Sequence, residues 1–157
     1  MKQRLKTLLD ARPELADIQY LETSEPSQQG DVVNADRTGD AVWFRGTDSD
    51  LSIDVLCVPQ VWDEAFSTDV VIQVARGRHG FSQDDCDARS SVILGAFLAV
   101  IGADPTLGLS GSWPDGILQA DITVDGWQQG TGHTAEMVGF VSVIDVQLSG
   151  TATLQPT

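Results

Sequence analysis

The sequence predicts an α+β domain: an antiparallel or mixed β-sheet, with one long buried helix packed on a face and a short N-terminal amphipathic helix. Two observations predict this class. An apolar run at residues 92–101 follows a helix-start signal, and segments of alternating apolar and polar residues lie on both sides of it. The chain has 157 residues, which is enough for one hydrophobic core. We therefore expect a single domain over residues 1–157, with a polar loop or arm at about 22–38.

The N-terminal segment has leucines at helical spacing, which predicts a short amphipathic helix over residues 2–11 that ends before Pro13. Its first turn is basic, although the helix dipole disfavours positive charge at that end. This local cost favours an acidic neighbour, such as another subunit, and simple solvation of a helix end explains it equally well. The basic interface candidates are Lys2, Arg4 and Lys6.

Strand patterns dominate the rest of the chain. Before the long helix, we expect strands at residues 41–45, 51–57 and 70–74. Residues 17–22 fit a further short strand. After the long helix, residues 118–125 alternate cleanly, which predicts a half-buried strand with one wet face. In residues 136–154 the apolar positions change from odd to even, so we expect a β-bulge or break near Val143 and Ile144.

The long helix is expected over about residues 83–101. Ser82 and Asp85 have the spacing of a capping box, and further acids in the first turn complement the helix dipole. The second half of the helix has no polar face, so we expect it to be buried on every side. Gly102 is the expected stop, and the Asp-Pro pair just after it prevents continuation.

Charge is the clearest feature of the composition. The formal net charge is −14, and four of the nine Lys and Arg residues lie in the first twelve positions. An acidic body repels nucleic acid, because duplex affinity comes mainly from Lys and Arg that neutralise phosphates. DNA-binding proteins are therefore disfavoured, whereas a surface past which DNA slides is compatible with this charge. Simple solubility explains the charge as well.

Targeting and redox signals are few. No apolar run reaches the length of a membrane span, and the N-terminus lacks the apolar core of a secretory signal, so synthesis and residence in the cytoplasm are the default. Cys57 and Cys86 have no metal-binding spacing, and we expect two free thiols in a reducing compartment.

The sequence offers no catalytic constellation, metal site or cofactor motif that outranks a structural explanation. It has no nucleophile elbow, P-loop or dinucleotide-binding glycine motif. His79 and His133 lie in Gly-flanked turns, and the Asp-rich segments lack the spacing of a calcium loop. Two tryptophans in expected turns remain as interface anchors or sugar-stacking residues, and packing within the domain explains them equally well: Trp113 and Trp127.

Several pieces, taken in order, resemble the tail terminator (tail-completion) proteins of bacteriophages with long non-contractile tails. They are D-A-V-W-F-R-G at residues 40–46, S-T-D-V-V-I-Q-V-A-R-G at 67–77, the acidic-capped helix with Ala88-Arg89, A-D-P-T-L-G at 103–108, and F-V-S-V-I-D-V-Q-L-S at 140–149. The helix that ends in A-D-P-T-L-G is the most distinctive piece. The polar segment 22–38 and the uninterrupted alternation of 118–124 depart from the pattern.

The resemblance implies a structural virion protein and not an enzyme. Such proteins form a hexameric ring on the head-proximal end of the tail tube, stop its polymerisation and present a surface to the head-completion or stopper protein. The expected partners are other copies of the chain, the tube protein, that head-completion protein and passing double-stranded DNA, with no membrane and no cofactor. The protein would be made in the host cytoplasm and reside in the virion.

An acidic channel lining would fit this role, and its candidates are Asp48 and Asp50 in an expected loop and Asp54, Asp121 and Asp125 on expected wet strand faces. The segment 22–38 is expected to order on assembly. A tail tube subunit or a head-tail stopper of the same assembly is the neighbouring hypothesis. A carbohydrate-binding module that uses Trp113 and Trp127 is the alternative from another class.

Overall fold

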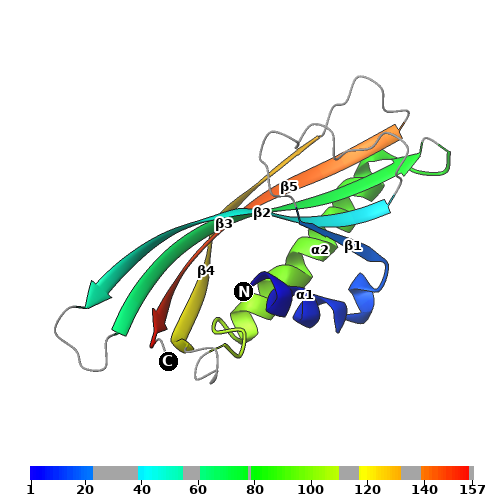
Figure 1. Ribbon diagram of the computed structural model, residues 1–157. Coiled ribbons are helices and arrows are strands. Elements are labelled where there is room, and N and C mark those ends of the chain that lie inside the picture. The colour runs from blue at the N-terminus through cyan, green and yellow to red at the C-terminus, as the bar shows by residue number, and fades with distance from the viewer. Residues whose placement is uncertain (23–38, 55–60, 78, 110–116, 132–138, 156–157) are drawn as a thin grey trace.

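The computed structural model (Figure 1) describes residues 1–22, 39–54, 61–77, 79–109, 117–131 and 139–155. Its helices are α1 (Lys2–Asp10), a short 3-10 helix (Pro13–Leu15) and α2 (Gln83–Ala103), and its strands are β1 (Ile18–Glu22), β2 (Gly39–Asp54), β3 (Val61–Gly77), β4 (Ile117–Thr131) and β5 (Gly139–Leu154). The predicted α+β class is confirmed, and so is the long helix between two groups of strands. Most of the polar segment 22–38 lies outside the described residues.

The strands form one mixed sheet in the order β1-β2-β3-β5-β4. β1 is parallel to β2, and the other neighbouring strands are antiparallel. α2 lies along one face of this sheet, α1 packs beside α2, and the far ends of β2 and β3 extend past the helices (Figure 1). We call the face that carries α2 the helix side and the opposite one the outer face.

β2 joins two segments that the sequence suggested as separate strands. It runs without a turn from Gly39 to Asp54, and a register shift against β3 between Phe44 and Thr47 marks a bulge. The bulge carbonyls have partners: the Thr68 hydroxyl lies 3.3 Å from the oxygens of both Arg45 and Gly46. The polar residues 46–50 were interpreted as a loop because they lack an apolar face. In the structure they continue β2 and pair with β3, and they are exposed to solvent.

The beginning of α2 is as predicted. The Ser82 side chain accepts a hydrogen bond from the Asp85 backbone nitrogen, and the Asp85 carboxylate accepts one from the Ser82 nitrogen at 2.7 Å. The Ser82 hydroxyl also donates a 2.8 Å hydrogen bond to the Asp85 carboxylate, and this bond, together with the one from the Ser82 nitrogen, lowers the pKa of Asp85. The predicted end was wrong by two residues: α2 runs through Gly102 to Ala103, and Asp104 is the C-cap. A glycine inside a helix costs only about 1 kcal/mol, so Gly102 does not end α2. The helix ends where Pro105 disfavours a helical conformation of the residue before it, Asp104.

The prediction that the second half of α2 is buried on every side was wrong. Val92 is 49% exposed, and Gly95, Ala99 and Gly102 are exposed as well. The sheet covers one side of the helix, and α1 with the 3-10 helix covers a second, so the remaining side faces solvent. Apart from Val92, the exposed residues named here are glycine or alanine, which keeps the exposed apolar area low.

The expected bulge near Val143 and Ile144 is also absent. The register between β3 and β5 is continuous from the Gly77–Gly139 pair to the Trp62–Leu154 pair. The apolar phase changes because both faces of the sheet are apolar there, so Val141 on the outer face is buried as well as Ile144 on the helix side. The shift between β4 and β5 falls instead between Val124 and Gly126.

The hydrophobic core lies between the helix side of the sheet and the two helices. Phe97 on α2 is fully buried, as predicted, and α1 contributes Leu5 and Leu9. The turn that follows α2 closes the core: Leu107 is fully buried with a positive φ of 50°, and its carbonyl accepts a 2.8 Å hydrogen bond from Arg4 Nε. This turn also explains Asp104, whose carboxylate accepts hydrogen bonds from Thr106 that lower the pKa of Asp104.

Candidate functional site

Alternation along β3 fixes which side chains point to the outer face. Val70, Ile72 and Val74 belong to the core on the helix side. Because successive side chains of a strand point to opposite faces, Asp69 lies on the outer face, and so does Asp63 farther along the strand. The cross-strand register then extends this assignment to β2, β5 and β4.

The outer face collects aspartates from all four long strands. Asp48 is paired with Ser67, Asp145 with Val71, and Asp121 with Thr151, and Ser149 donates a 2.8 Å hydrogen bond to Asp125. The aspartates of the outer face are therefore Asp48, Asp50, Asp63, Asp69, Asp121, Asp125 and Asp145. Asp48, Asp50, Asp63, Asp121 and Asp125 are exposed, and Asp69 and Asp145 keep 46% and 50% of their side-chain area in solvent.

This arrangement brings together most of the predicted channel-lining residues. Asp48, Asp50, Asp121 and Asp125 share the outer face, although Asp48 and Asp50 lie in β2 and not in the expected loop. The backbone of Asp54 pairs with that of Val61, and its side chain lies outside the described part of the chain. The clean alternation of β4 is confirmed by Ala120 and Ile122, which are buried on the helix side.

Small residues form the middle of the outer face between these aspartates. Register places Ala65 of β3 beside Thr151 of β5, and Asp50 and Asp121 flank that pair on the two outer strands. Two shallow hollows of about 410 and 330 Å³ lie on the two sides of Ala65. The half of the outer face that contains Ala65 and Thr151, which we call the lower half, therefore has small residues along its middle and carboxylates on both sides. We call this surface the acidic trough.

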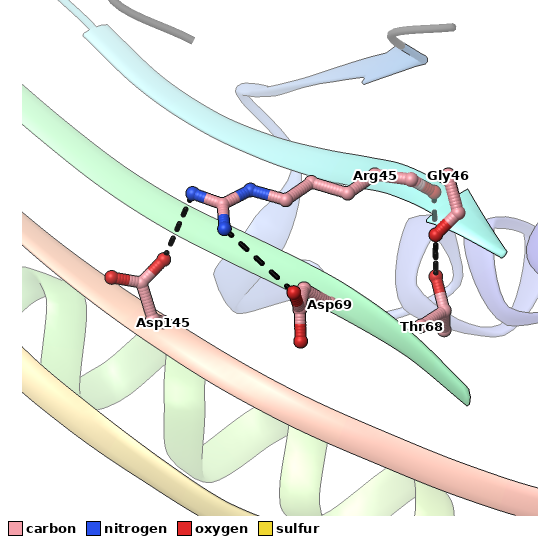
Figure 2. Close-up of polar contacts among 5 residues, drawn as sticks. All are labelled: Arg45, Gly46, Thr68, Asp69 and Asp145. Atoms are coloured by element: carbon pink, nitrogen blue, oxygen red, sulfur yellow. Dashed lines mark hydrogen bonds and ion pairs between the residues drawn. The ribbon is translucent and has the colours of Figure 1, made fainter. Parts of the chain in front are cut away.

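Arg45 is a basic residue on this acidic surface. Figure 2 shows its side chain reaching from β2 across β3 to β5. Its Nη2 is 3.2 Å from Asp145 Oδ1, and its Nη1 is 3.8 Å from Asp69 Oδ2. Since each carboxylate is about half exposed, these pairs are screened by water and add little stability. Their effect is to order one guanidinium within the acidic surface and to neutralise part of its charge.

The remaining basic residues lie elsewhere in the described part of the chain. Lys2 Nζ donates a 2.7 Å hydrogen bond to the Arg45 carbonyl, and Arg4 is bonded to the turn after α2. Lys6 lies half-buried in α1, and Arg12 pairs with Glu14. The basic interface candidates thus lie in the helix layer, on the opposite side of the sheet from the acidic trough.

A buried ion cluster that the sequence did not reveal holds α2 against the sheet. Asp40 is the first aspartate of D-A-V-W-F-R-G; its side chain is 6% exposed, and its register with Val74 places it on the helix side. Its Oδ1 is 2.6 Å from Arg76 Nη2, and its Oδ2 accepts a 2.7 Å hydrogen bond from Arg89 Nε. One carboxylate therefore joins β2, β3 and α2. The three residues are far apart in the sequence, and no local pattern indicates that they meet.

The buried polar side chains near α2 have no catalytic arrangement. The hydroxyls of Ser90 and Ser142 are 2.9 Å apart, and Gln129 is the third member of the group. Neither serine has a histidine or carboxylate partner in the described residues, so nothing activates it as a nucleophile. Cys86 is a free, fully buried thiol whose pKa is raised by burial, which keeps it in the unreactive protonated form. Cys57 lies outside the described residues.

The other predicted candidates are placed as follows. Trp127 lies in β4 and not in a turn, points to the helix side beside the edge of the sheet, and is 56% exposed. Trp113 and His133 lie outside the described residues, and His79 is exposed. Within the described ranges, no group of three or more His, Cys, Asp or Glu residues could hold a metal ion.

α2 is long and apolar enough to cross a bilayer, when judged by length and composition alone. The apolar core helix of a globular domain meets the same two criteria. In this chain the side of α2 that carries Ile93, Phe97 and Ile101 packs against the sheet and the N-terminal helices. No protein-family model matches the chain, and no curated protein sequence does.

Proposed function

We propose that this chain is a structural virion protein, a tail terminator of a long-tailed phage with a non-contractile tail. Copies of the chain form a ring, hexameric in this family, that caps the head-proximal end of the tail tube. The ring stops tube polymerisation and presents a joining surface to the head-completion protein. DNA passes through the ring along the outer face.

The observation that supports the proposal most is the concentration of aspartates, with a single arginine among them, on one face of the sheet. The outer face carries seven aspartates, named above, and one arginine, whereas the other described basic residues lie in or beside the helix layer. A sheet whose helix side forms the core, and whose outer face carries exposed carboxylates on both sides of Ala65 and Thr151, suits a ring whose inner wall faces DNA. The acidic-capped helix with its A-D-P-T-L-G end adds the sequence resemblance to that family.

Electrostatics explains how such a wall would work. A phosphate at a distance below the Debye length, about 8 Å at physiological ionic strength, is repelled by a carboxylate with little screening. A basic wall would hold the duplex, because each Lys or Arg that neutralises a phosphate adds affinity through counterion release. Carboxylates repeated around a ring keep the duplex near the axis without binding it.

A charge-reversal experiment tests this role. In one variant Asp48, Asp50 and Asp121 on the outer face become lysine; in the matched control, Asp10, Asp17 and Asp84 in or beside the helix layer become lysine. All six are exposed, so both variants gain the same charge with little loss of packing. The assembled outer-face variant should retain double-stranded DNA in a salt-dependent manner, and the control should not. Equal retention by both rings would overturn the DNA-facing role.

A capping experiment tests the terminator role itself. Adding the protein to polymerising tail tube subunits should shorten the tubes and leave one ring at one end. Open-ended filaments of the protein alone would instead identify a tube subunit. Binding to a glycan array that is lost in Trp127→Ala, by a protein that never assembles, would identify the carbohydrate-binding alternative.

A further inference from the structure

The two outermost strands of the sheet, β1 and β4, each have one edge that no other described strand pairs with, and these edges lie at the same position along the strand direction. β1 pairs only with β2, and β4 pairs only with β5, among the strands that the structure describes. The register connects Glu22 to Trp127 through Phe44, Val70 and Val146, and it connects Ile18 to Thr131 through Asp40, Val74 and Ser142. Residues 127–131 of β4 therefore lie level with all of β1.

Two features interrupt the β4 edge before this segment. The Ile122 nitrogen donates a 2.9 Å hydrogen bond to the Pro105 carbonyl, so the turn after α2 occupies the edge at this position. The register shift between Val124 and Gly126 then interrupts the strand. A bulge and a covering loop are two ways in which proteins prevent edge-to-edge association. Among the described residues, neither feature protects residues 126–131.

The backbone groups of this free segment point outward at alternate residues. Ile122 sends its N–H away from β5, and it stands opposite Gly150. Outward groups recur at every second residue of an antiparallel pair, which means opposite Val146 and Ile144 after the bulge. The register places Trp127 and Gln129 at these two positions. No other described strand pairs with their N–H and C=O groups, which can therefore bind a strand of another copy.

The free segment also lacks the residues that usually guard an edge. Its sequence, G-W-Q-Q-G-T, contains no Lys, no Pro and no charge, in a chain of which 20% of the residues are charged. Trp127 is 56% exposed at this edge. An exposed tryptophan beside unpaired backbone groups is typical of a contact anchor.

Strand direction selects the partner. β1 runs parallel to β2, and three antiparallel steps separate β2 from β4, so β1 and β4 run in opposite directions. When a neighbouring copy stands beside this one with its sheet in the same orientation, its β1 lies antiparallel to this β4. The two free segments match in level and in length, and antiparallel pairing is the arrangement that their directions allow.

We infer that copies of this chain join through their sheet edges, β1 of one copy pairing with residues 127–131 of the next. The contact is heterologous, because it uses two different surfaces, and repetition of such a contact closes a ring when the rotation permits. The sheet then continues from copy to copy, with the helix layers on one side and the acidic faces on the other. This inference rests on the proposed function, since it names the contact through which the ring closes.

Two substitutions at one position test the contact. Gln129→Pro removes an outward N–H and leaves the ladder with β5 intact, because proline is tolerated on an edge strand whose N–H faces solvent. Gln129→Ala is the matched control, since both variants lose the amide that reaches Ser90 and Ser142. Mass photometry should find rings for the wild type and Gln129→Ala and monomers for Gln129→Pro, with circular dichroism spectra that agree.

The outcomes separate this contact from the proposed function. Rings formed by Gln129→Pro as readily as by Gln129→Ala would overturn the edge contact and leave the ring intact. A wild type that stays monomeric, alone and with tube subunits, would overturn the proposed function and the contact with it.

If Gln129→Pro does not fold, hydrogen exchange on the wild type decides. The Trp127 and Gln129 amides should exchange at least tenfold more slowly in the ring than in the monomer. The Gln128 amide, which faces β5, is the internal control. Unchanged exchange at Trp127 and Gln129 would overturn the contact.

Discussion

The two faces of the sheet are built from the same strands and differ in almost every property. On the helix side, Val70, Ile72 and Val146 are fully buried. Their immediate neighbours Asp69 and Asp145 point to the outer face and keep about half of their area in water. Strand alternation alone therefore separates a core from a charged surface one residue apart. It also separates the two demands on the chain: the helix side provides stability, and the outer face is left free for charge.

The same comparison applies along the sheet. In the upper half of the outer face, Trp43, Val71, Ala75 and Val141 are buried. In the lower half, the same face carries exposed aspartates and small polar residues. Substitutions that move a residue type from one environment to the other should give effects that differ by several kcal/mol, and they test the comparison directly.

The largest effect is expected at the centre of the core. Phe97→Ala should lower the free energy of unfolding by about 3–5 kcal/mol, because it removes a fully buried ring and leaves a cavity. Val92→Ala, on the exposed side of the same helix, should cost less than about 1 kcal/mol. Chemical denaturation of both variants measures the difference. Similar losses would mean that α2 does not pack as described.

The ion cluster on the helix side should come next. Asp40→Asn leaves Arg76 and Arg89 without their shared carboxylate and should cost about 2–3 kcal/mol. The cost is below that of a fully buried pair because both guanidinium groups reach water. Asp69→Asn on the outer face should cost less than about 0.5 kcal/mol. A neutral Asp40→Asn, measured by thermal unfolding, would contradict the structural role of the cluster.

A smaller effect is expected at Gly150 in β5, which pairs with Phe66 of β3. A Cβ at Gly150 would overlap the Phe66 ring on one side and the Asp121 carbonyl oxygen on the other, so Gly150→Ala should cost about 1–3 kcal/mol. Gly130, also in the sheet, has open space around it, and Gly130→Ala should be tolerated. Denaturant midpoints of the two alanine variants provide the comparison. A larger loss of stability for Gly130→Ala than for Gly150→Ala would contradict the packing described around Gly150.

The smallest effect belongs to the cap of α2. Ser82→Ala should cost about 1 kcal/mol at neutral pH, because it removes one half of the capping box. The folded-state pKa of Asp85 is lowered, so the stabilisation from its carboxylate is present above its ordinary pKa and is lost as the pH falls through the folded value. The difference between Ser82→Ala and wild type should therefore shrink in acid. A difference that does not depend on pH would argue against the reciprocal bonds.

Local signals predicted the fold well. The capping box, the leucine spacing of α1 and the alternation of residues 118–125 each depend on residues within a few positions of one another. The errors have a different origin. The sequence of α2 shows how apolar the helix is, but the number of layers around it decides that Val92 is exposed. For β5, burial of both faces at Val141 produced the change of phase that was interpreted as a bulge.

The site was predictable to the extent that it follows alternation. Asp121 and Asp125 were placed on a wet face because β4 alternates cleanly, whereas Asp69 and Asp145 were missed because apolar residues flank them on both faces. Arg45 meets its two carboxylates only through the order of the strands. The cluster around Asp40 depends on tertiary contacts between distant residues, and sequence patterns carry no information about these.

The orientation of the sheet in an assembled ring tests the central claim most directly. A cryo-electron microscopy map of the ring on a tail tube would locate both faces of each subunit. The predicted result is a central channel lined by Asp48, Asp50, Asp121 and Asp125, with α2 on the side away from the channel. A channel lined by α1, with Lys2, Arg4, Lys6 and Arg12 toward the axis and the acidic face outside, would contradict it.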